Sequence, residues 1–191
     1  TIEQLVSGSG DIRNPIVSSE PWFNTEGMVS QRSVVNLYKK GTHSLNIYNN
    51  HGVPASLTLL KGETYNNEDI YRLKMTVNDP AILSSFRNSF HSHGVYFGGF
   101  NFPQNAGFRS TINWRPVSPK PMKFGGTASN IGGWSEVPNE DLGDGWKRAT
   151  QTRTGAGIAT RSDNIFYSVI CPTIELGEEL CIDVCCPFLK E

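Results

Sequence analysis

Three strand-like runs separated by turn signals occupy the last third of the chain. The first follows a Gly-Asp-Gly turn at residues 143–145 and alternates two sets of side chains, which is the period-two pattern of a strand. Residues 165–171 are rich in aromatic and β-branched side chains, and Pro172 ends that run. The third run places one apolar set on a single face: Leu180, Ile182, Val184, Cys186 and Phe188. The C-terminal third is therefore predicted to be β structure.

The rest of the chain has the same organisation. Further strand-like runs lie at residues 33–38, 44–48, 56–60, 70–77, 94–100, 108–117 and 122–125. Turn-forming residues separate them, and the chain contains 19 Gly and 11 Pro. About ten short antiparallel strands at this spacing predict an all-β fold, a jelly-roll β-sandwich. Helical turns fit only residues 80–90, and the glycine-rich stretch 125–145 is predicted to be a long surface loop.

Length and charge limit the classes of protein to which this chain can belong. At 191 residues it can bury one sizeable core, and one folded domain is predicted at residues 29–191. Residues 1–28 are predicted to be an irregular segment or linker, and the start at Thr1 suggests a piece of a longer protein. A net charge of −1 gives no general attraction to nucleic acid or to an anionic membrane. No apolar run approaches the roughly 20 residues of a membrane helix, so membrane insertion is not expected either.

The closing strands resemble those of a known family. Trp146 begins one strand, Gly177 lies in the turn after the next, and Ile182-Asp183 enters the last strand. In this arrangement the last two thirds of the chain are similar to the jelly-roll carbohydrate-binding modules that end bacteriophage tail fibres and tailspikes. Such modules are also appended to glycan-degrading enzymes. The resemblance implies a non-catalytic domain that recognises a bacterial surface glycan as the host receptor.

Assembly, location and a metal site follow from the same resemblance. Tail fibres of this kind are homotrimers, so the domain is expected to be one of three copies in a longer fibre, on the virion and extracellular when it acts. Two other functions stay open: an accessory carbohydrate-binding module of a glycan-degrading enzyme, and a structural or trimerising tip domain without a ligand. Some family members hold a structural calcium near the chain ends, where Asp183 matches the ligand position and Asp11 or Glu20 would assist. No other cofactor or metal is expected.

Two of the predicted strands indicate a basic sheet face. In residues 70–77 and 108–117 apolar side chains alternate with a polar set that contains Arg72, Lys74, Arg109, Asn113 and Arg115. Solvated sheet faces ordinarily contain such cations, and that interpretation stays open. The alternative is a groove for an acidic glycan, because the planar guanidinium group binds carboxylates through two hydrogen bonds. These five residues are therefore candidate ligand-binding residues.

Aromatic residues are the other candidates, since sugar sites stack an exposed ring on the C–H face of a pyranose. Trp134 lies in the predicted glycine-rich loop, from which we expect it to overhang the basic face, although a buried role is equally open. Tyr96 joins it as a candidate ligand-binding residue. Further aromatic candidates are Trp22, Tyr48 and Tyr65. Trp114 and Trp146 fall in register with apolar positions and are predicted core residues.

Catalytic patterns are weak in this sequence. His91 and His93 flank Ser92, but no nucleophile elbow accompanies them, so they are predicted to be solvated turn histidines. The acidic residues between 136 and 144 lie in one loop rather than across a cleft. We therefore predict no enzymatic activity and no catalytic residue.

Four cysteines lie near the C-terminal end, at positions 171, 181, 185 and 186. Their spacing matches no zinc motif, and they are predicted to be free, buried thiols. Cys185 and Cys186 are adjacent in a predicted strand, so we expect their side chains to face opposite sides of it.

Overall fold

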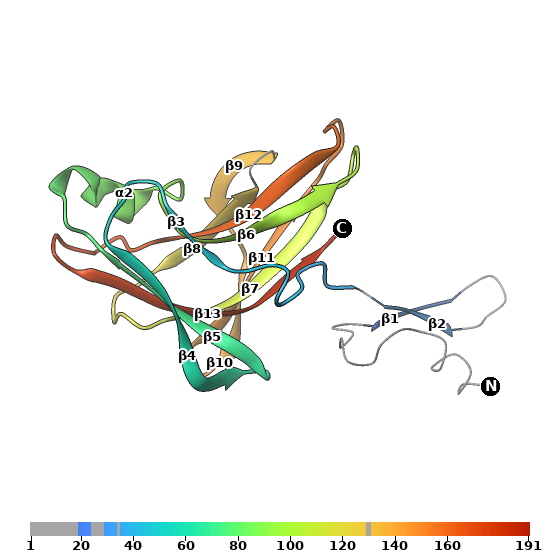
Figure 1. Cartoon of the computed structure of the whole chain (residues 1–191), viewed down its shortest axis with the longest axis horizontal. Coiled ribbons are helices and arrows are strands. Elements are labelled where there is room, and N and C mark those ends of the chain that lie inside the picture. Colours follow the sequence, from blue (N-terminus) through green and yellow to red (C-terminus); the bar gives the residue numbers. More distant parts are fainter. Residues whose placement is uncertain (1–18, 24–28, 34, 129–130) are drawn as a thin grey trace. The chain divides into compact units, whose positions relative to one another are not determined.

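Two compact units, Thr1–Asn36 and Leu37–Glu191, make up the chain in the computed structural model (Figure 1). The structure describes residues 19–23, 29–33, 35–128 and 131–191. In the first unit, β1 (Ser19–Phe23) pairs antiparallel with β2 (Val29–Ser33). β1 therefore lies within the segment that the sequence predicts to be irregular, and the boundary between the units falls after Asn36 rather than at residue 28.

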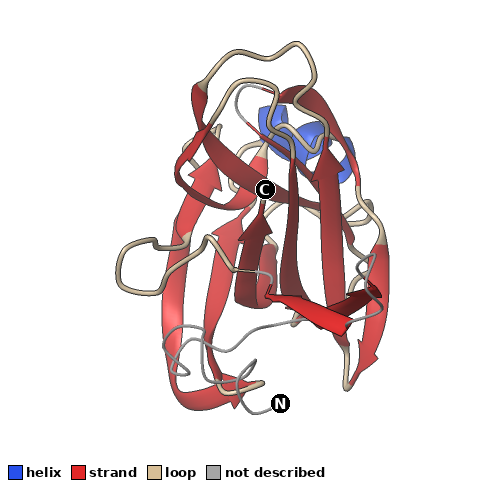
Figure 2. Ribbon diagram, turned by 90° about the vertical axis from the view of Figure 1, so that its right-hand side faces the viewer, coloured by secondary structure: helices blue, strands red, loops and turns tan. Residues whose placement is uncertain are grey.

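The second unit is a β-sandwich of two antiparallel sheets, which confirms the predicted all-β fold (Figures 1 and 2). The six-stranded sheet has the order β10-β11-β7-β13-β5-β4, and the five-stranded sheet has the order β3-β6-β12-β8-β9. The strands of the larger sheet are β4 (Ala55–Tyr65), β5 (Glu68–Thr76), β7 (Phe108–Pro116), β10 (Asn139–Gly143), β11 (Trp146–Arg153) and β13 (Glu179–Lys190). Those of the smaller sheet are β3 (Asn46–Asn49), β6 (His93–Phe102), β8 (Lys123–Ala128), β9 (Ile131–Glu136) and β12 (Arg161–Ile170). After β5 the chain crosses repeatedly from one sheet to the other, as jelly-roll folds do.

A short helical segment lies at one end of the sandwich (Figure 2). It consists of a 3-10 turn η1 (Pro80–Ile82) and the helix α2 (Leu83–Asn88). The Asp79 side chain caps the segment by accepting a hydrogen bond from the Ala81 amide at 2.8 Å. These turns agree with the helical stretch predicted at residues 80–90.

The main core lies between the two sheets, where alternate residues of the facing strands meet. β5 contributes Leu73 and Met75, and β7 contributes Ile112 and Trp114, as the alternation predicts. Trp114 stacks on Phe124 of the other sheet, with 4.6 Å between ring centroids. The inner faces of β5 and β7 are thereby fixed, and their polar sets must face outward.

A second, smaller apolar cluster lies on the outer face of the six-stranded sheet. Trp146 is buried there and not in the main core, because the register pairs Lys147 with Trp114 and turns Trp146 to the opposite face. Its ring stacks on Tyr65 with 4.5 Å between centroids, and the Arg115 guanidinium lies 4.7 Å from the indole centroid. The predicted burial of Trp146 is confirmed, whereas its predicted position in the main core is wrong.

A bulge in β13 reverses the alternation of that strand. The pairing with β7 shifts between Cys185 and Phe188, and Cys186 has a φ of 55°. Val184 belongs to the core before the bulge, and Leu189 rather than Phe188 belongs to it afterwards. The prediction that Cys186 and Phe188 continue the core face was therefore wrong, because the bulge inserts residues that the simple period of two does not count.

The glycine-rich stretch from residue 125 to 145 is not the predicted long loop, since it contains β9 and β10. A Cβ on Gly125 would lie 2.5 Å from the Phe90 ring and 2.6 Å from the Ser135 carbonyl oxygen. Glycine at this position thus permits close packing of strand and ring. The prediction of a strand at residues 33–38 was also wrong. β2 ends at Ser33, and residues 35–38 form no strand.

Candidate functional site

The outer face of the six-stranded sheet contains the predicted basic set, which we call the basic face. Its members are Arg72 and Lys74 from β5 and Arg109, Asn113 and Arg115 from β7. β13 lies between these two strands, and its Asp183 is opposite both Arg72 and Arg115. The period-two pattern thus predicted the common face of these residues correctly.

Asp183 pairs with two arginines at the centre of the basic face. Arg72 Nε lies 2.8 Å from Oδ1, and Arg115 Nη2 lies 2.7 Å from Oδ2. The carboxylate is fully buried, whereas each arginine side chain is 30% exposed. A ligand that displaced these guanidinium groups would leave a buried carboxylate unpaired, which is costly. The main role of Arg72 and Arg115 is therefore to stabilise the sheet through their ion pairs with Asp183.

The remaining members of the basic face differ in their partners. Lys74 Nζ lies 3.3 Å from Glu179 Oε1. Asn113 is almost fully buried and accepts a hydrogen bond from Arg148 Nε at 3.4 Å. Arg109 is exposed, and within the part of the chain that the structure describes it belongs to no ion pair. Carboxylates of this chain thus already neutralise much of the positive charge on the basic face.

The calcium ligand that the resemblance assigns to Asp183 has other partners here. Each of its carboxylate oxygens accepts hydrogen bonds from arginine side chains, so a cation at this position would have to replace guanidinium groups. Asp11 lies outside the described residues, as does the side chain of Glu20. Among the described residues there is no group of three or more His, Cys, Asp or Glu placed to hold a metal ion.

Trp134 and Tyr96 lie on the other sheet, away from the basic face. Tyr96 is in β6 and Trp134 in β9, both in the five-stranded sheet. Trp134 therefore does not overhang Arg109 or Arg115, and the predicted combination of cations and stacking ring is not brought together. The cause is the pairing of β9 with β8, which places Trp134 in the sheet that lacks β5 and β7.

Four aromatic side chains meet on the outer face of the five-stranded sheet, and we call them the aromatic surface: Tyr48, Tyr96, Trp134 and Phe166. Phe166 in the central strand β12 is opposite Tyr96 in β6, and their ring centroids are 5.2 Å apart. Trp134 stacks on Tyr48 with 5.2 Å between centroids and 13° between ring planes. β3 and β9 are the two edges of this sheet, so β9 must curl over its face to bring these rings together (Figure 1).

Arg153 helps to hold β9 in this position. Its Nη2 atom donates hydrogen bonds to the Gly126 carbonyl oxygen at 2.8 Å and to the Gly133 carbonyl oxygen at 3.0 Å. One guanidinium thus connects β8 to the residue before Trp134. The pairing of β8 with β9 also shifts between Gly126 and Ala128, and such a bulge bends a strand.

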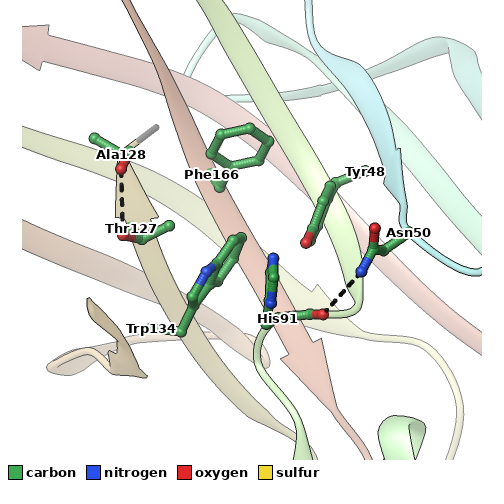
Figure 3. Close-up of a pocket in the computed structure, with 7 residues that line it drawn as sticks. All are labelled: Tyr48, Asn50, His91, Thr127, Ala128, Trp134 and Phe166. Carbon is green, nitrogen blue, oxygen red and sulfur yellow. Dashed lines mark hydrogen bonds between the residues drawn. The ribbon is translucent and has the colours of Figure 1, made fainter. Parts of the chain in front are cut away.

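A pocket of about 300 Å³ opens on the aromatic surface (Figure 3). The described residues that line it are Tyr48, Asn50, His91, Thr127, Ala128, Trp134 and Phe166. His91 lies beside Trp134, with 4.9 Å between ring centroids. Asn50 Nδ2 donates to the His91 carbonyl oxygen at 3.4 Å, which joins two loops at the pocket rim. The pocket thus combines ring faces with amide, imidazole and hydroxyl groups.

Tyr48, which lines this pocket, has a hydroxyl without a hydrogen-bond partner among the described residues. Its oxygen is buried and has no hydrogen bond within the described part of the protein. Burial raises the pKa of Tyr48 to about 12, so the hydroxyl keeps its proton at neutral pH and remains a donor. Buried polar groups are nearly always hydrogen-bonded, but this oxygen is itself covered, so a ligand in the pocket reaches it only after a neighbouring side chain moves.

Sequence reasoning missed Phe166 and placed Tyr48 only among the further aromatic candidates. Phe166 had a detectable signal. In β12 the core contains Ile165 and Tyr167, so Phe166 is an aromatic residue in the outward-facing set of a strand. Outward-facing rings indicate a binding surface when neighbouring strands bring several of them together in one patch.

His93 is not the solvated turn histidine that was predicted. It is 1% exposed and stacks on Phe86 of α2 with 3.7 Å between centroids. Burial lowers the pKa of His93 to about 3, so the imidazole is neutral in the folded protein at neutral pH. His93 is therefore part of the packing between α2 and the five-stranded sheet.

No protein-family model matches the sequence, and the search of curated proteins gives no match. No helix in the described residues is long and apolar enough to cross a membrane. The function must therefore be inferred from the two outer faces and from the resemblance of the closing strands.

Proposed function

We propose that this protein is a non-catalytic glycan-binding domain and that the sugar binds at the aromatic surface. The observation that supports this site most is the group of outward-facing rings around the 300 Å³ pocket. A pyranose presents an apolar C–H face and a rim of hydroxyl groups. Rings that stack on the first, next to polar groups that bond the second, are the usual composition of a sugar site.

The aromatic surface is also rigid before a ligand arrives. Its rings contact one another: Tyr48 and Phe166 have centroids 5.0 Å apart, and Trp134 and Phe166 have centroids 5.6 Å apart. Strands hold all of these residues, and Arg153 fixes the position of β9. Little side-chain entropy is then lost on binding, which favours affinity for a weakly interacting ligand such as a sugar.

The lining of the pocket favours an uncharged sugar. The described lining residues include no Lys, Arg, Asp or Glu. A carboxylated sugar would lose its hydration there without gaining a cation. We therefore propose a neutral pyranose unit as the ligand of the aromatic surface, in place of the acidic glycan that the basic face suggests from sequence.

The biological partner follows from the resemblance to tail-fibre modules. We propose a bacterial surface polysaccharide as the partner, host attachment as the role, and a homotrimeric fibre on the virion as the setting. An accessory module of a glycan-degrading enzyme would use the same aromatic surface. A structural tip without a ligand is the alternative in which the pocket has no function.

A glycan array of bacterial surface polysaccharides, followed by calorimetry on any hit, tests the proposal. We expect binding by the wild type, loss of binding in Trp134→Ala, and unchanged binding in the basic-face control Arg109→Ala. The isolated domain should sediment as a trimer or a weakly associating monomer. Silence on the array together with stable trimers would support the structural tip, and loss of binding only in the Arg109 variant would move the site to the basic face.

A further inference from the structure

Cys185 and Cys186 form a dithiol that the alternation of a regular strand would not allow. In a regular strand, neighbouring side chains point to opposite faces. Here the bulge and the positive φ of Cys186 turn both side chains to the outer face, and the two Sγ atoms are 3.0 Å apart. The prediction that these cysteines face opposite sides is therefore wrong. A disulfide needs an S–S distance of about 2.05 Å, so the sulfurs have to move about 1 Å closer, and the Cα atoms of adjacent residues, about 3.8 Å apart across a trans peptide, are closer together than in most disulfides.

The two thiols have different surroundings. Cys185 is fully buried in the cluster that contains Trp146, whereas Cys186 is partly exposed. Cys186 is also one of the residues that line a small recess, together with Lys40, Glu68 and Tyr71. The pairing of β13 with β5 ends at Val184, although Tyr65 of β4 and Ile70 of β5 still pack near the bulge. A small reagent can therefore reach Cys186 before Cys185.

Hydrogen bonding assigns the chemical roles within the pair. When Cys186 is a thiolate, Cys185 is the donor of the hydrogen bond between the two sulfurs, which are 3.0 Å apart. The bond from Cys185 lowers the pKa of the Cys186 thiol, and the same bond, together with burial, raises the pKa of Cys185. A thiolate is the nucleophile in exchange with disulfides, so Cys186 attacks and Cys185 resolves.

We infer that Cys185 and Cys186 form a thiol–disulfide exchange site that small, uncharged organic disulfides oxidise to a disulfide between adjacent residues. The Cys186 thiolate attacks one sulfur of R–S–S–R, which breaks that bond and forms a mixed disulfide, and the released thiolate takes a proton from water. The Cys185 thiol then loses its proton to water and attacks Cys186 Sγ, and the second R–S⁻ leaves and is protonated. The protein loses two electrons and two thiol hydrogens, and the reagent is reduced to two R–SH.

The side chains around the recess support an uncharged reagent. Glu68 and Asp69 lie beside Cys186, and Lys40 pairs with Asp69 at 2.6 Å. An anionic disulfide would meet these carboxylates. Hydroxyethyl disulfide has no charge and is small, and we therefore choose it as the probe.

The experiment treats the folded protein with hydroxyethyl disulfide and measures the mass of the intact chain and of its proteolytic fragments. We expect the wild type to lose two hydrogen atoms without an adduct, and the fragment that contains both cysteines to hold the disulfide. Cys185→Ser should keep one mercaptoethanol adduct on Cys186, and Cys186→Ser should stay unmodified. Cys181→Ser is the matched control, since Cys181 lies buried in the same strand, and it should behave like the wild type.

A second readout is the fluorescence of Trp146, which packs in the same cluster as Cys185. Oxidation should quench it, and dithiothreitol should restore it. The inference is overturned if the folded wild type ends as a stable adduct without ring closure. It is equally overturned if the folded protein does not react while the urea-unfolded chain does, or if Cys171 or Cys181 reacts first.

Discussion

The outer faces of the two sheets differ in how their polar groups are used. On the six-stranded sheet, Asp183 lies between Arg72 and Arg115, and the side chains pair with one another across neighbouring strands. On the five-stranded sheet, aromatic rings surround a pocket of about 300 Å³. The first face uses its chemistry to stabilise the fold, whereas the second leaves groups available to a ligand.

This contrast shows why charge alone is a poor indicator of a binding face. A row of cations has the same appearance in sequence whether its counter-charges are in a ligand or in the next strand. The register of β13 decides the matter here, because it brings Asp183 opposite both arginines. Removal of an arginine from such a pair measures folding and not recognition.

The two tryptophans of the outer faces provide the largest expected difference. Trp146 is 2% exposed in the cluster of the six-stranded sheet, so Trp146→Ala should lower the free energy of unfolding by about 3 to 5 kcal/mol. Trp134 is only partly buried, and Trp134→Ala should cost about 1 kcal/mol or less. Urea unfolding of both variants measures this. Equal decreases in the free energy of unfolding would mean that the aromatic surface stabilises the fold in the same way as the cluster around Trp146.

Acid should lower the free energy of unfolding because His93 is buried in its neutral form. Its pKa is about 3 in the folded protein and 6.5 at its ordinary value, so between these pH values the unfolded chain binds a proton that the folded chain does not. Stability should therefore fall as the pH falls, by about 3 kcal/mol between pH 6.5 and pH 4. Urea unfolding over this range checks the slope. His93→Gln should flatten it, and an unchanged slope in that variant would assign the acid sensitivity to other groups.

Affinity for the glycan should depend on the ring of Trp134. Trp134→Ala should weaken binding by about 2 kcal/mol, because a stacking ring at the centre of a small site provides a large share of its affinity. Trp134→Phe keeps a ring and serves as the matched control, which should bind nearly as well as the wild type. Calorimetry on the array hit measures both. If the alanine variant bound the glycan as tightly as the wild type, the aromatic surface would not be the binding site.

The basic face should give the smallest effect. Arg109→Ala changes the exposed arginine of that face, and both stability and glycan affinity should change by less than about 0.5 kcal/mol. Affinity should also be insensitive to salt, since a neutral ligand forms no ion pair. A titration at low and high salt tests this. The acidic-glycan hypothesis would be restored if Arg109→Ala bound the glycan more weakly and if high salt weakened binding by the wild type to the same extent.

Local patterns in the sequence were sufficient for several elements. The alternation of β5 and β7 predicted which residues face the core, because a strand that is buried on one face has a period of two that needs no knowledge of its neighbours. The helical turn after Asp79 was predicted in the same way, from a stretch that lacks strand alternation. The predicted common face of Arg72 and Arg115 followed from the same period.

Other elements depended on pairings that no local pattern contains. The register of β11 against β7 decides on which side of the sheet Trp146 lies. A bulge in β13 decides this for Phe188. β9 is a strand because β8 is available beside it, although its sequence is rich in glycine. Each of these is a property of two strands together.

The sequence by itself determined an all-β chain, the polar and apolar faces of its regular strands, and the aromatic residues from which a sugar site can be built. The tertiary structure alone decided which sheet each candidate joins. It separated Trp134 from the basic face, brought it to Tyr48 across the five-stranded sheet, and placed Cys185 and Cys186 on one side of β13. The physical reason is that side-chain alternation is local, whereas strand order, register and bulges are set by the packing of segments far apart in the chain.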